Sequence, residues 1–145
     1  MSPRALLVLN CQISERQFSA MEPRDEEFLE GGVRICASLA AWCVQNGVDV
    51  GFLTNGAAVL PDRELNIPPR CSEAQLAHIL EALAILKIRM ELDLHVLLDR
   101  QLEKGAQDMD ILIVSAYWSD ALEQRAQALR RLNNSVTWLK IGGGA

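Results

Sequence analysis

The feature that most constrains the fold is a pair of short, unbroken apolar runs. Residues 5–9 read Ala-Leu-Leu-Val-Leu, and residues 111–114 read Ile-Leu-Ile-Val. Runs of this length are too short for a helix, and their lack of polar alternation is typical of strands that are covered on both faces. Strands of this kind occur in parallel sheets, in which helices connect one strand to the next. The two runs therefore predict the centre of a parallel sheet.

The segments around these runs carry apolar residues at helical spacing. Four helices are expected, over residues 26–45, 72–86, 91–104 and 120–132. Ser72 opens the second of them and Ser119 precedes the fourth, and both are expected as N-caps. Two more strands are expected over residues 48–53 and 136–141, and the proline-rich loop has room for a short edge strand near residues 65–67. Alternating strands and helices predict one α/β domain over residues 1–145, a doubly wound and mostly parallel sheet with helices on both faces.

Composition excludes several classes of function. The formal net charge is −5, whereas nucleic-acid binding depends on clustered Lys and Arg, so no nucleic-acid partner is expected. The apolar runs are far shorter than the ~20 residues that cross a bilayer, so this segment is not expected to insert into a membrane. The cysteines at positions 11, 36, 43 and 71 have no C-x-x-C spacing, and we expect buried free thiols in a cytoplasmic domain.

The turn after the first strand is the first place to look for a ligand site, because open α/β sheets bind ligands beyond the carboxyl ends of their strands. It reads Asn-Cys-Gln-Ile-Ser over residues 10–14. It has neither the glycines of a dinucleotide-binding or Walker-type loop nor a basic residue. No nucleotide cofactor is therefore expected.

A family resemblance rests on three features: the polar turn after the first strand, the Ala-Ser-Leu-Ala of residues 37–40, and the Val-Gly-Phe-Leu-Thr-Asn-Gly of residues 50–56. The sequence resembles a von Willebrand factor A domain, and more narrowly the bacterial domain-of-unknown-function family fifty-eight. Members of that family often lie beside MoxR-type AAA+ ATPases. The resemblance implies that the partner is such an ATPase or a client it remodels. Because the chain begins directly at its first strand, we expect it to be the C-terminal piece of a longer protein, with any membrane anchor upstream.

The family pattern includes a metal-ion-dependent adhesion site, built from D-x-S-x-S, a threonine and the Asp of T-D-G. The matching positions here are Asn10, Gln12, Ser14, Ser72, Ser115 and Ala116. None is a carboxylate, and a hard dication prefers anionic oxygen ligands. We therefore expect a degenerate, metal-free site and no cofactor. The alternative is a displaced carboxylate, from Glu15 or Asp120, that restores metal binding.

Two aromatic residues follow the 111–114 strand, at the edge where such sheets recognise ligands. Aromatic side chains are common interface anchors, so Tyr117 and Trp118 are candidate partner contacts. The alternative for Trp118 is that its ring folds back over the start of the next helix. Trp42 and Trp138, inside a helix and a strand, are expected in the core.

Two classes of function therefore remain open. The first is a non-enzymatic protein-interaction or adaptor domain. The second is a small-ligand binder or a thiol-dependent enzyme, which would use a pocket formed by Cys11, Ser14 and Ser72. The only imidazoles, His78 and His95, are predicted to lie mid-helix among aliphatic residues and are not expected to act as bases.

Overall fold

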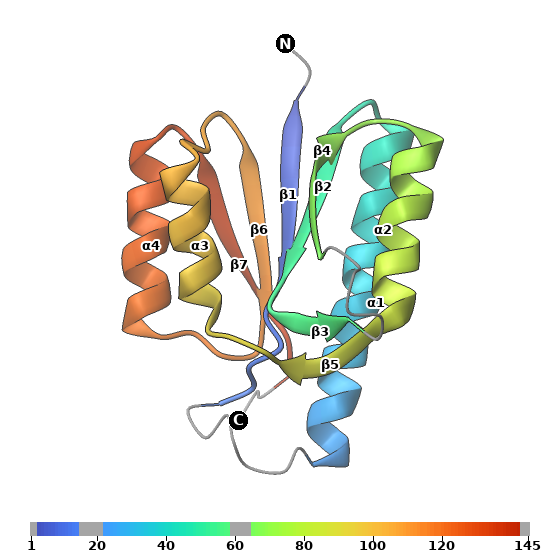
Figure 1. Ribbon diagram of the computed structural model, residues 1–145, viewed down its shortest axis with the longest axis vertical. Helices are drawn as coiled ribbons and strands as arrows, with labels where there is room; N and C mark the ends of the chain where they lie inside the picture. The colour runs from blue at the N-terminus through green and yellow to red at the C-terminus, as the bar shows by residue number, and fades with distance from the viewer. Residues whose placement is uncertain (1–2, 15–21, 59–64, 143–145) are drawn as a thin grey trace.

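Strands and helices alternate along the chain (Figure 1), and the computed structural model describes residues 3–14, 22–58 and 65–142. The elements are β1 (Arg4–Leu9), α1 (Pro23–Gln45), β2 (Asp49–Thr54), β3 (Gly56–Ala58), β4 (Asn66–Arg70), α2 (Glu73–Ile85), β5 (Leu86–Met90), α3 (Leu94–Glu103), β6 (Asp110–Ser115), α4 (Asp120–Arg131) and β7 (Ser135–Lys140). In the described part of the chain, no helix has the length and apolar content of a membrane span.

The central sheet has five strands in the order β4-β2-β1-β6-β7. The last four of these are mutually parallel, with Leu7 of β1 aligned to Phe52 on one side and to Leu112 on the other. Strand β4 is antiparallel to β2 and forms one edge. Strands β3 and β5 form a separate antiparallel pair beyond the carboxyl ends of the parallel strands, seen at the bottom of Figure 1. The predicted α/β fold with a mostly parallel sheet is confirmed.

Helices cover both faces of this sheet, which explains the unbroken apolar run of β1. Leu7 and Leu9 pack toward α1 and α2, whereas Leu6 and Val8 pack toward α3 and α4. All four side chains are at most 2% exposed. Burying one Leu or Val side chain stabilises a fold by about 1.5–3 kcal/mol, so both faces of β1 contribute to the core.

Helix α1 lies close to the sheet because one of its buried positions is glycine. A Cβ atom at Gly32 would lie 3.0 Å from methyl carbons of Leu9 and Ile141. The helix has 23 residues, or about 34 Å of rise, whereas a six-residue strand spans roughly 20 Å. Its first turns therefore extend past the carboxyl ends of the strands, as Figure 1 shows. There the Phe28 ring lies against Gly142, where a Cβ atom would collide with the ring.

The expectation that Trp42 lies in the core is wrong, because its side chain is 57% exposed. The buried positions of α1 include Ala40 and Cys43. Trp42 is adjacent in sequence to Cys43 and is therefore turned by about 100° away from the buried stripe. The apolar character of a residue alone therefore does not show whether its side chain points to the core or to solvent.

The loop that contains β4 is held in place by Gln75. Ser72 caps α2 as predicted, since its hydroxyl accepts a hydrogen bond from the Gln75 amide at 3.0 Å. The Gln75 side chain does not return to the cap. Its Nε2 instead donates to the carbonyls of Val50 (2.6 Å) and Pro68 (2.9 Å), beside the register shift between β2 and β4. Gln75 thus joins the edge strand to the sheet.

The region after α2 differs most from expectation. The sequence pattern predicts a helix through Leu86, but β5 begins at that residue and alternates half-buried Leu86, Ile88 and Met90 with exposed Lys87 and Arg89. The edge strand expected near residues 65–67 is present as β4. Ser119 caps α4, as predicted, through a 3.2 Å hydrogen bond from the Leu122 amide.

Candidate functional site

Polar side chains follow three neighbouring parallel strands and meet at the carboxyl edge of the sheet. Asn10 follows β1, Asn55 follows β2, and Ser115 ends β6. The Asn10 amide donates from Nδ2 to the Ser115 hydroxyl at 3.0 Å. Its Oδ1 accepts from the Gln12 backbone amide and from Asn55 Nδ2, both at 3.0 Å. Asn10, which is 0% exposed, is therefore the centre of the cluster.

Asn55 joins this cluster to the β3–β5 pair. Its Oδ1 accepts from the Cys11 backbone amide at 2.8 Å, and its Nδ2 also donates to the Leu92 carbonyl at 3.0 Å. The neighbouring Thr54 hydroxyl donates to the Leu9 carbonyl at 2.8 Å and accepts from the Gly56 amide at 3.2 Å. No buried side-chain nitrogen or oxygen among the described residues lacks a hydrogen-bond partner. We call Asn10, Thr54, Asn55 and Ser115 the amide cluster.

The amide cluster does not fit the divalent cation that the family pattern implies. Its oxygens are neutral, and its members bond to one another and to nearby backbone groups. Across residues 3–14, 22–58 and 65–142, no group of three or more His, Cys, Asp or Glu side chains has an arrangement suited to a metal. Asp120 is exposed in the first turn of α4, where a negative charge favours the positive end of the helix dipole. Glu15 lies outside the described residues.

Ser72 is not part of this edge, which corrects the grouping expected from the sequence. Strand β4 runs antiparallel to β2, so Arg70 pairs with Val50 near the start of β2. The adjacent Cys71 thiol reaches the Val44 carbonyl, at 3.7 Å, just before β2 begins. Ser72 therefore lies at the amino edge of the sheet. It cannot share a pocket with Cys11 and Ser14, which are at the carboxyl edge.

The other predicted positions lie at the carboxyl edge. Gln12 is buried and donates from Nε2 to the backbone carbonyl of Ser14 at 3.0 Å, while the Ser14 side chain is exposed. Ala116 and Tyr117 are half-buried. The Ser115 hydroxyl donates to the Tyr117 carbonyl and accepts from the Tyr117 amide. The turn after β6 is thus fastened to the amide cluster.

The thiols are poorly placed for nucleophilic chemistry. Cys11 is 2% exposed, and desolvation by burial raises the pKa of its thiol to about 11, although a contact with the Thr54 hydroxyl opposes this. Burial raises the pKa of Cys36 to about 12. Thiol reactivity depends on the thiolate, which these environments suppress at neutral pH. The prediction of buried free thiols is confirmed for Cys11, Cys36 and Cys43, but Cys71 is exposed.

Two tryptophans stack beside the amide cluster. The rings of Trp118 and Trp138 have centroids 5.0 Å apart and planes inclined by 15°. Trp118 donates from Nε1 to the Glu123 carboxylate at 3.0 Å, and Trp138 donates from Nε1 to the Ser115 carbonyl at 2.9 Å. Both residues are half-buried. We call them the tryptophan pair.

Trp118 thus folds toward the first turn of α4 while keeping part of its ring exposed. Its hydrogen bond is the main cause that lowers the pKa of the Glu123 carboxyl, with Gln127 and Arg130 adding to the effect. The Lys140 ammonium lies 5.9 Å from the centroid of the Trp138 ring. The sequence pattern places Trp138 in the core and gives no role to Lys140. Trp138 stays half-buried because it belongs to the outermost strand, a position that the sequence pattern does not reveal.

No protein-family model matches this chain, and a search of curated proteins also finds no match.

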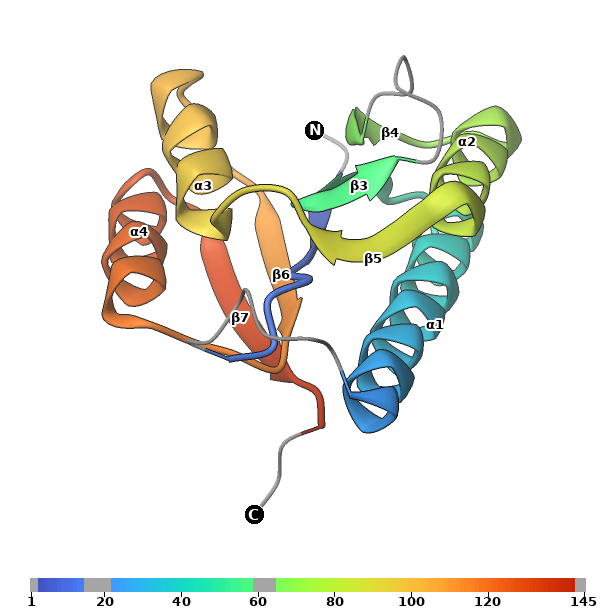
Figure 2. The same cartoon turned by 60° about the horizontal axis from the view of Figure 1, so that its bottom comes forward.

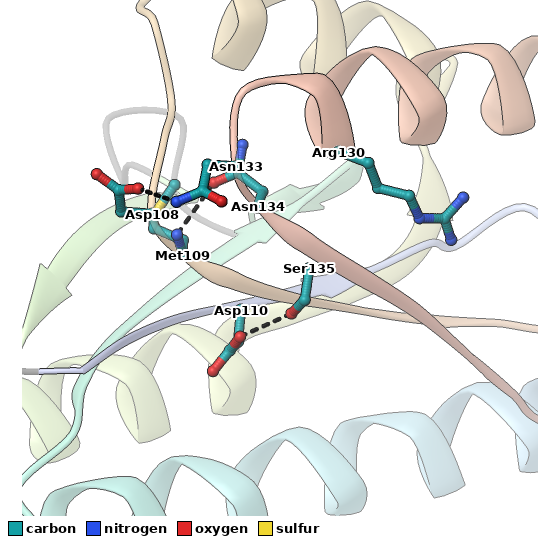
Figure 3. Close-up of a pocket in the computed structure, with 7 residues that line it drawn as sticks. All are labelled: Asp108, Met109, Asp110, Arg130, Asn133, Asn134 and Ser135. Carbon is teal, nitrogen blue, oxygen red and sulfur yellow. Dashed lines mark hydrogen bonds between the residues drawn. The ribbon is translucent and has the colours of Figure 1, made fainter.

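A hollow of about 480 Å³ lies at the opposite, amino edge of the sheet, between the turns that precede β6 and β7 (Figure 3). It is lined by Asp108, Met109, Asp110, Arg130, Asn133, Asn134 and Ser135. Both of its carboxylates are already engaged: Asn133 donates to Asp108 at 2.6 Å, and Ser135 donates to Asp110 at 2.7 Å. Asp108 and Asn133 adopt left-handed backbone angles, with φ of 59° and 64°, which Asp and Asn tolerate better than most residues. These contacts tie two turns together.

Proposed function

We propose that this chain is a non-enzymatic protein-interaction or adaptor domain with a degenerate, metal-free adhesion site. Its proposed partner is a MoxR-type AAA+ ATPase, the partner that the family resemblance implies. The observation that carries the proposal is the contrast at the carboxyl edge. The polar groups there are neutral and bond to one another, whereas the tryptophan pair beside them keeps part of its surface exposed.

The chemistry of the edge supports binding over catalysis. A nucleophile needs an activating base or a lowered pKa, whereas the pKa of the Cys11 thiol is raised by burial. The Ser115 hydroxyl donates to a backbone carbonyl and is not paired with an imidazole. The proposal takes the chain as a cytoplasmic domain, which agrees with four cysteines that are all free thiols.

Tyr117 and Trp118 are the proposed partner contacts. Tryptophan and tyrosine are enriched among the residues that dominate interface energies. Trp118 is held by its stacking and by its bond to Glu123, so little side-chain freedom remains to be lost when a partner covers the ring. A preorganised aromatic anchor of this kind favours tight binding.

The test is a titration of this domain with a purified, nucleotide-free MoxR-type ATPase from the same organism, once in Mg²⁺ and once in EDTA. We expect equal Kd values in the two buffers. Trp118→Ala should weaken binding by roughly 30-fold, which corresponds to ~2 kcal/mol. Trp42→Ala, which truncates an exposed tryptophan on α1, is the matched control and should leave Kd unchanged.

Trp118→Phe guards against loss of folding, because it keeps an aromatic ring against Trp138 while removing the bond to Glu123. Its melting temperature should stay close to that of the parent. Binding that requires Mg²⁺ would contradict the metal-free site. Absence of binding by the folded parent chain would contradict the proposed partnership.

A further inference from the structure

In the part of the chain that the structure describes, strand β7 is an open edge of the central sheet. Within residues 3–14, 22–58 and 65–142 it is last in the strand order and pairs only with β6, in parallel. Figure 2 shows the strand at the rim of the sheet, with α4 packed to one side. Ser135, Thr137 and Lys140 are exposed. An uncovered edge offers backbone donors and acceptors to another strand.

The hydrogen-bond pattern shows which residues of β7 carry those free groups. The amide of Ser135 donates to the Met109 carbonyl, and the amide of Ile141 donates to the Ser115 carbonyl. Odd-numbered positions therefore point their backbone groups toward β6. Because a strand alternates, the N–H and C=O groups of Val136, Trp138 and Lys140 point away from it. The Val136 carbonyl is taken by the Arg130 guanidinium at 2.8 Å, which leaves Trp138 and Lys140 as the open pair.

The opposite edge of the sheet is closed by its own chain. Strand β4 contains Pro68 and Pro69, which have no N–H group to donate and are confined to such edges. The Pro68 carbonyl is already bound by Gln75 Nε2 at 2.9 Å. Strand β7 has six residues and no proline. As far as the described residues define the two edges, β7 is the one that can accept a further strand through a regular set of backbone hydrogen bonds.

The charges along β7 indicate the kind of strand that fits. Lys140 lies at one end of the free edge, and Arg130, whose guanidinium forms an ion pair with Glu123 at 3.6 Å, lies at the other. Among the described residues, no carboxylate forms an ion pair with Lys140, whose ammonium instead lies over the Trp138 ring. Trp138 belongs to both the free edge and the tryptophan pair. The edge therefore continues into the surface proposed above.

We infer that the partner binds by adding an extended segment alongside β7, with an acidic side chain near Lys140 and an apolar side chain against the tryptophan pair. Main-chain bonds to Trp138 and Lys140 provide the pairing, and the side chains provide selectivity. This inference rests on the proposed function and names the way in which that partner binds.

A second copy of this chain fits the same edge poorly. Antiparallel pairing of two β7 strands about Trp138 places Lys140 of one copy opposite Val136 of the other. The Val136 carbonyl is already bound by the Arg130 guanidinium, which also pairs with Glu123, so the Lys140 amide of each copy would lack its acceptor in the other copy. A backbone donor that is buried without a partner destabilises the pairing. The edge favours an acidic segment of a different protein.

The experiment measures hydrogen exchange at single-residue resolution in the intact chain, alone and with the nucleotide-free MoxR-type ATPase. We expect exchange at the Trp138 and Lys140 amides to slow by about tenfold or more in the complex. Lys140→Pro removes one of these amides without touching the bonds from β7 to β6. It should weaken binding by about tenfold more than Lys140→Ala, which removes only the charge.

The outcomes separate the two proposals. Slowed exchange at Trp138 and Lys140, together with the greater effect of proline, supports strand addition. If the ATPase binds and Trp118→Ala weakens it, but the β7 amides exchange as before, strand addition is overturned and the proposed function stands. Absence of ATPase binding by the folded chain overturns both. Protection of β7 that rises with the concentration of this chain alone assigns the edge to a second copy and overturns the inference.

Discussion

Replacing Asn10 with aspartate tests whether the amide cluster depends on amide chemistry. The substitution restores the carboxylate of the family pattern at a side chain that is 0% exposed. It keeps two acceptor contacts, from the Gln12 amide and Asn55 Nδ2, but it removes the donor to Ser115. The Ser115 oxygen, whose proton goes to the Tyr117 carbonyl, would then face an anionic oxygen.

The expected cost follows from these contacts. One lost hydrogen bond costs about 1 kcal/mol, and a buried charge with incomplete hydrogen bonding adds about 1–3 kcal/mol. Asn10→Asp should therefore lower the free energy of unfolding by about 2–4 kcal/mol near neutral pH. At roughly 2–4 °C per kcal/mol, a middle value of ~3 kcal/mol lowers Tm by roughly 6–12 °C. Urea denaturation and a thermal melt measure both quantities.

The pH dependence of this cost has a definite sign. Burial should raise the pKa of the new carboxyl, and once protonated this group can again donate a hydrogen bond to Ser115. A raised folded-state pKa gives stability that is present at low pH and lost as pH rises, so the cost should be smaller near about pH 5 than near about pH 8. Gln107→Glu, which introduces the same charge at an exposed position, is the control and should cost less than about 0.5 kcal/mol.

Addition of millimolar Mg²⁺ completes the test. Any ligand that binds only the folded state raises Tm by mass action. We expect no such rise for the parent chain or for Asn10→Asp, because one carboxylate among neutral, bonded groups is a poor site for a hard dication. An Asn10→Asp variant as stable as the parent, or a parent chain stabilised by Mg²⁺ and destabilised by a chelator, would refute the reasoning.

Three further predictions concern the thiols, the edge strand and α1. In the native protein Cys71 should react rapidly with a thiol reagent, while Cys11 and Cys36 should react only on unfolding, and fast labelling of Cys11 would contradict its burial. Because burial raises the pKa of Cys11 from 9.0 to about 11, the stability that this thiol contributes should fall as the pH rises from about 9 to about 11. Gln75→Ala leaves two carbonyls without their side-chain donor, so urea denaturation should show a loss of about 1–3 kcal/mol; an unchanged midpoint would mean that Gln75 does not hold β4. Trp42→Ser should change stability by less than about 1 kcal/mol, since the ring is mostly exposed, and a loss of the size typical of core tryptophans would show that the ring is buried after all.

The sequence was sufficient to predict the central architecture, because that part depends on local patterns. The apolar run of β1 has no polar position, and a strand of this kind must be covered on both faces. Ser72 and Ser119 cap helices through the backbone amides three residues later, as their spacing predicts. Patterns of this kind depend only on residues that are near one another in the chain.

The errors arise where the answer depends on distant parts of the chain. The sequence alone groups Ser72 with Asn10 because it does not give the direction of β4. Since β4 is antiparallel to β2, the helix that follows it begins at the amino edge of the sheet and not at the carboxyl edge. Strand β5 is hidden in the sequence because its alternation from Leu86 to Met90 follows an apolar helix without a break, and its partner β3 has only three residues. The matching of Asn10, Asn55 and Ser115 as donors and acceptors becomes visible only when three strand ends are brought together.

Because its first turns extend past the carboxyl ends of the strands, α1 has two parts that should differ in the free energy of local opening. From Gly32 onward one face of the helix is buried against the sheet, so its amides can exchange only when the core opens. Ahead of Gly32 most positions are exposed, and buried Leu29 and the contact of Phe28 with Gly142 are the main anchors there. Gly31, where an added Cβ atom would meet nothing within 4 Å, adds backbone freedom at the boundary. The first turns of α1 should therefore open and close at a small fraction of the global unfolding free energy, as a separate unit coupled to the end of β7.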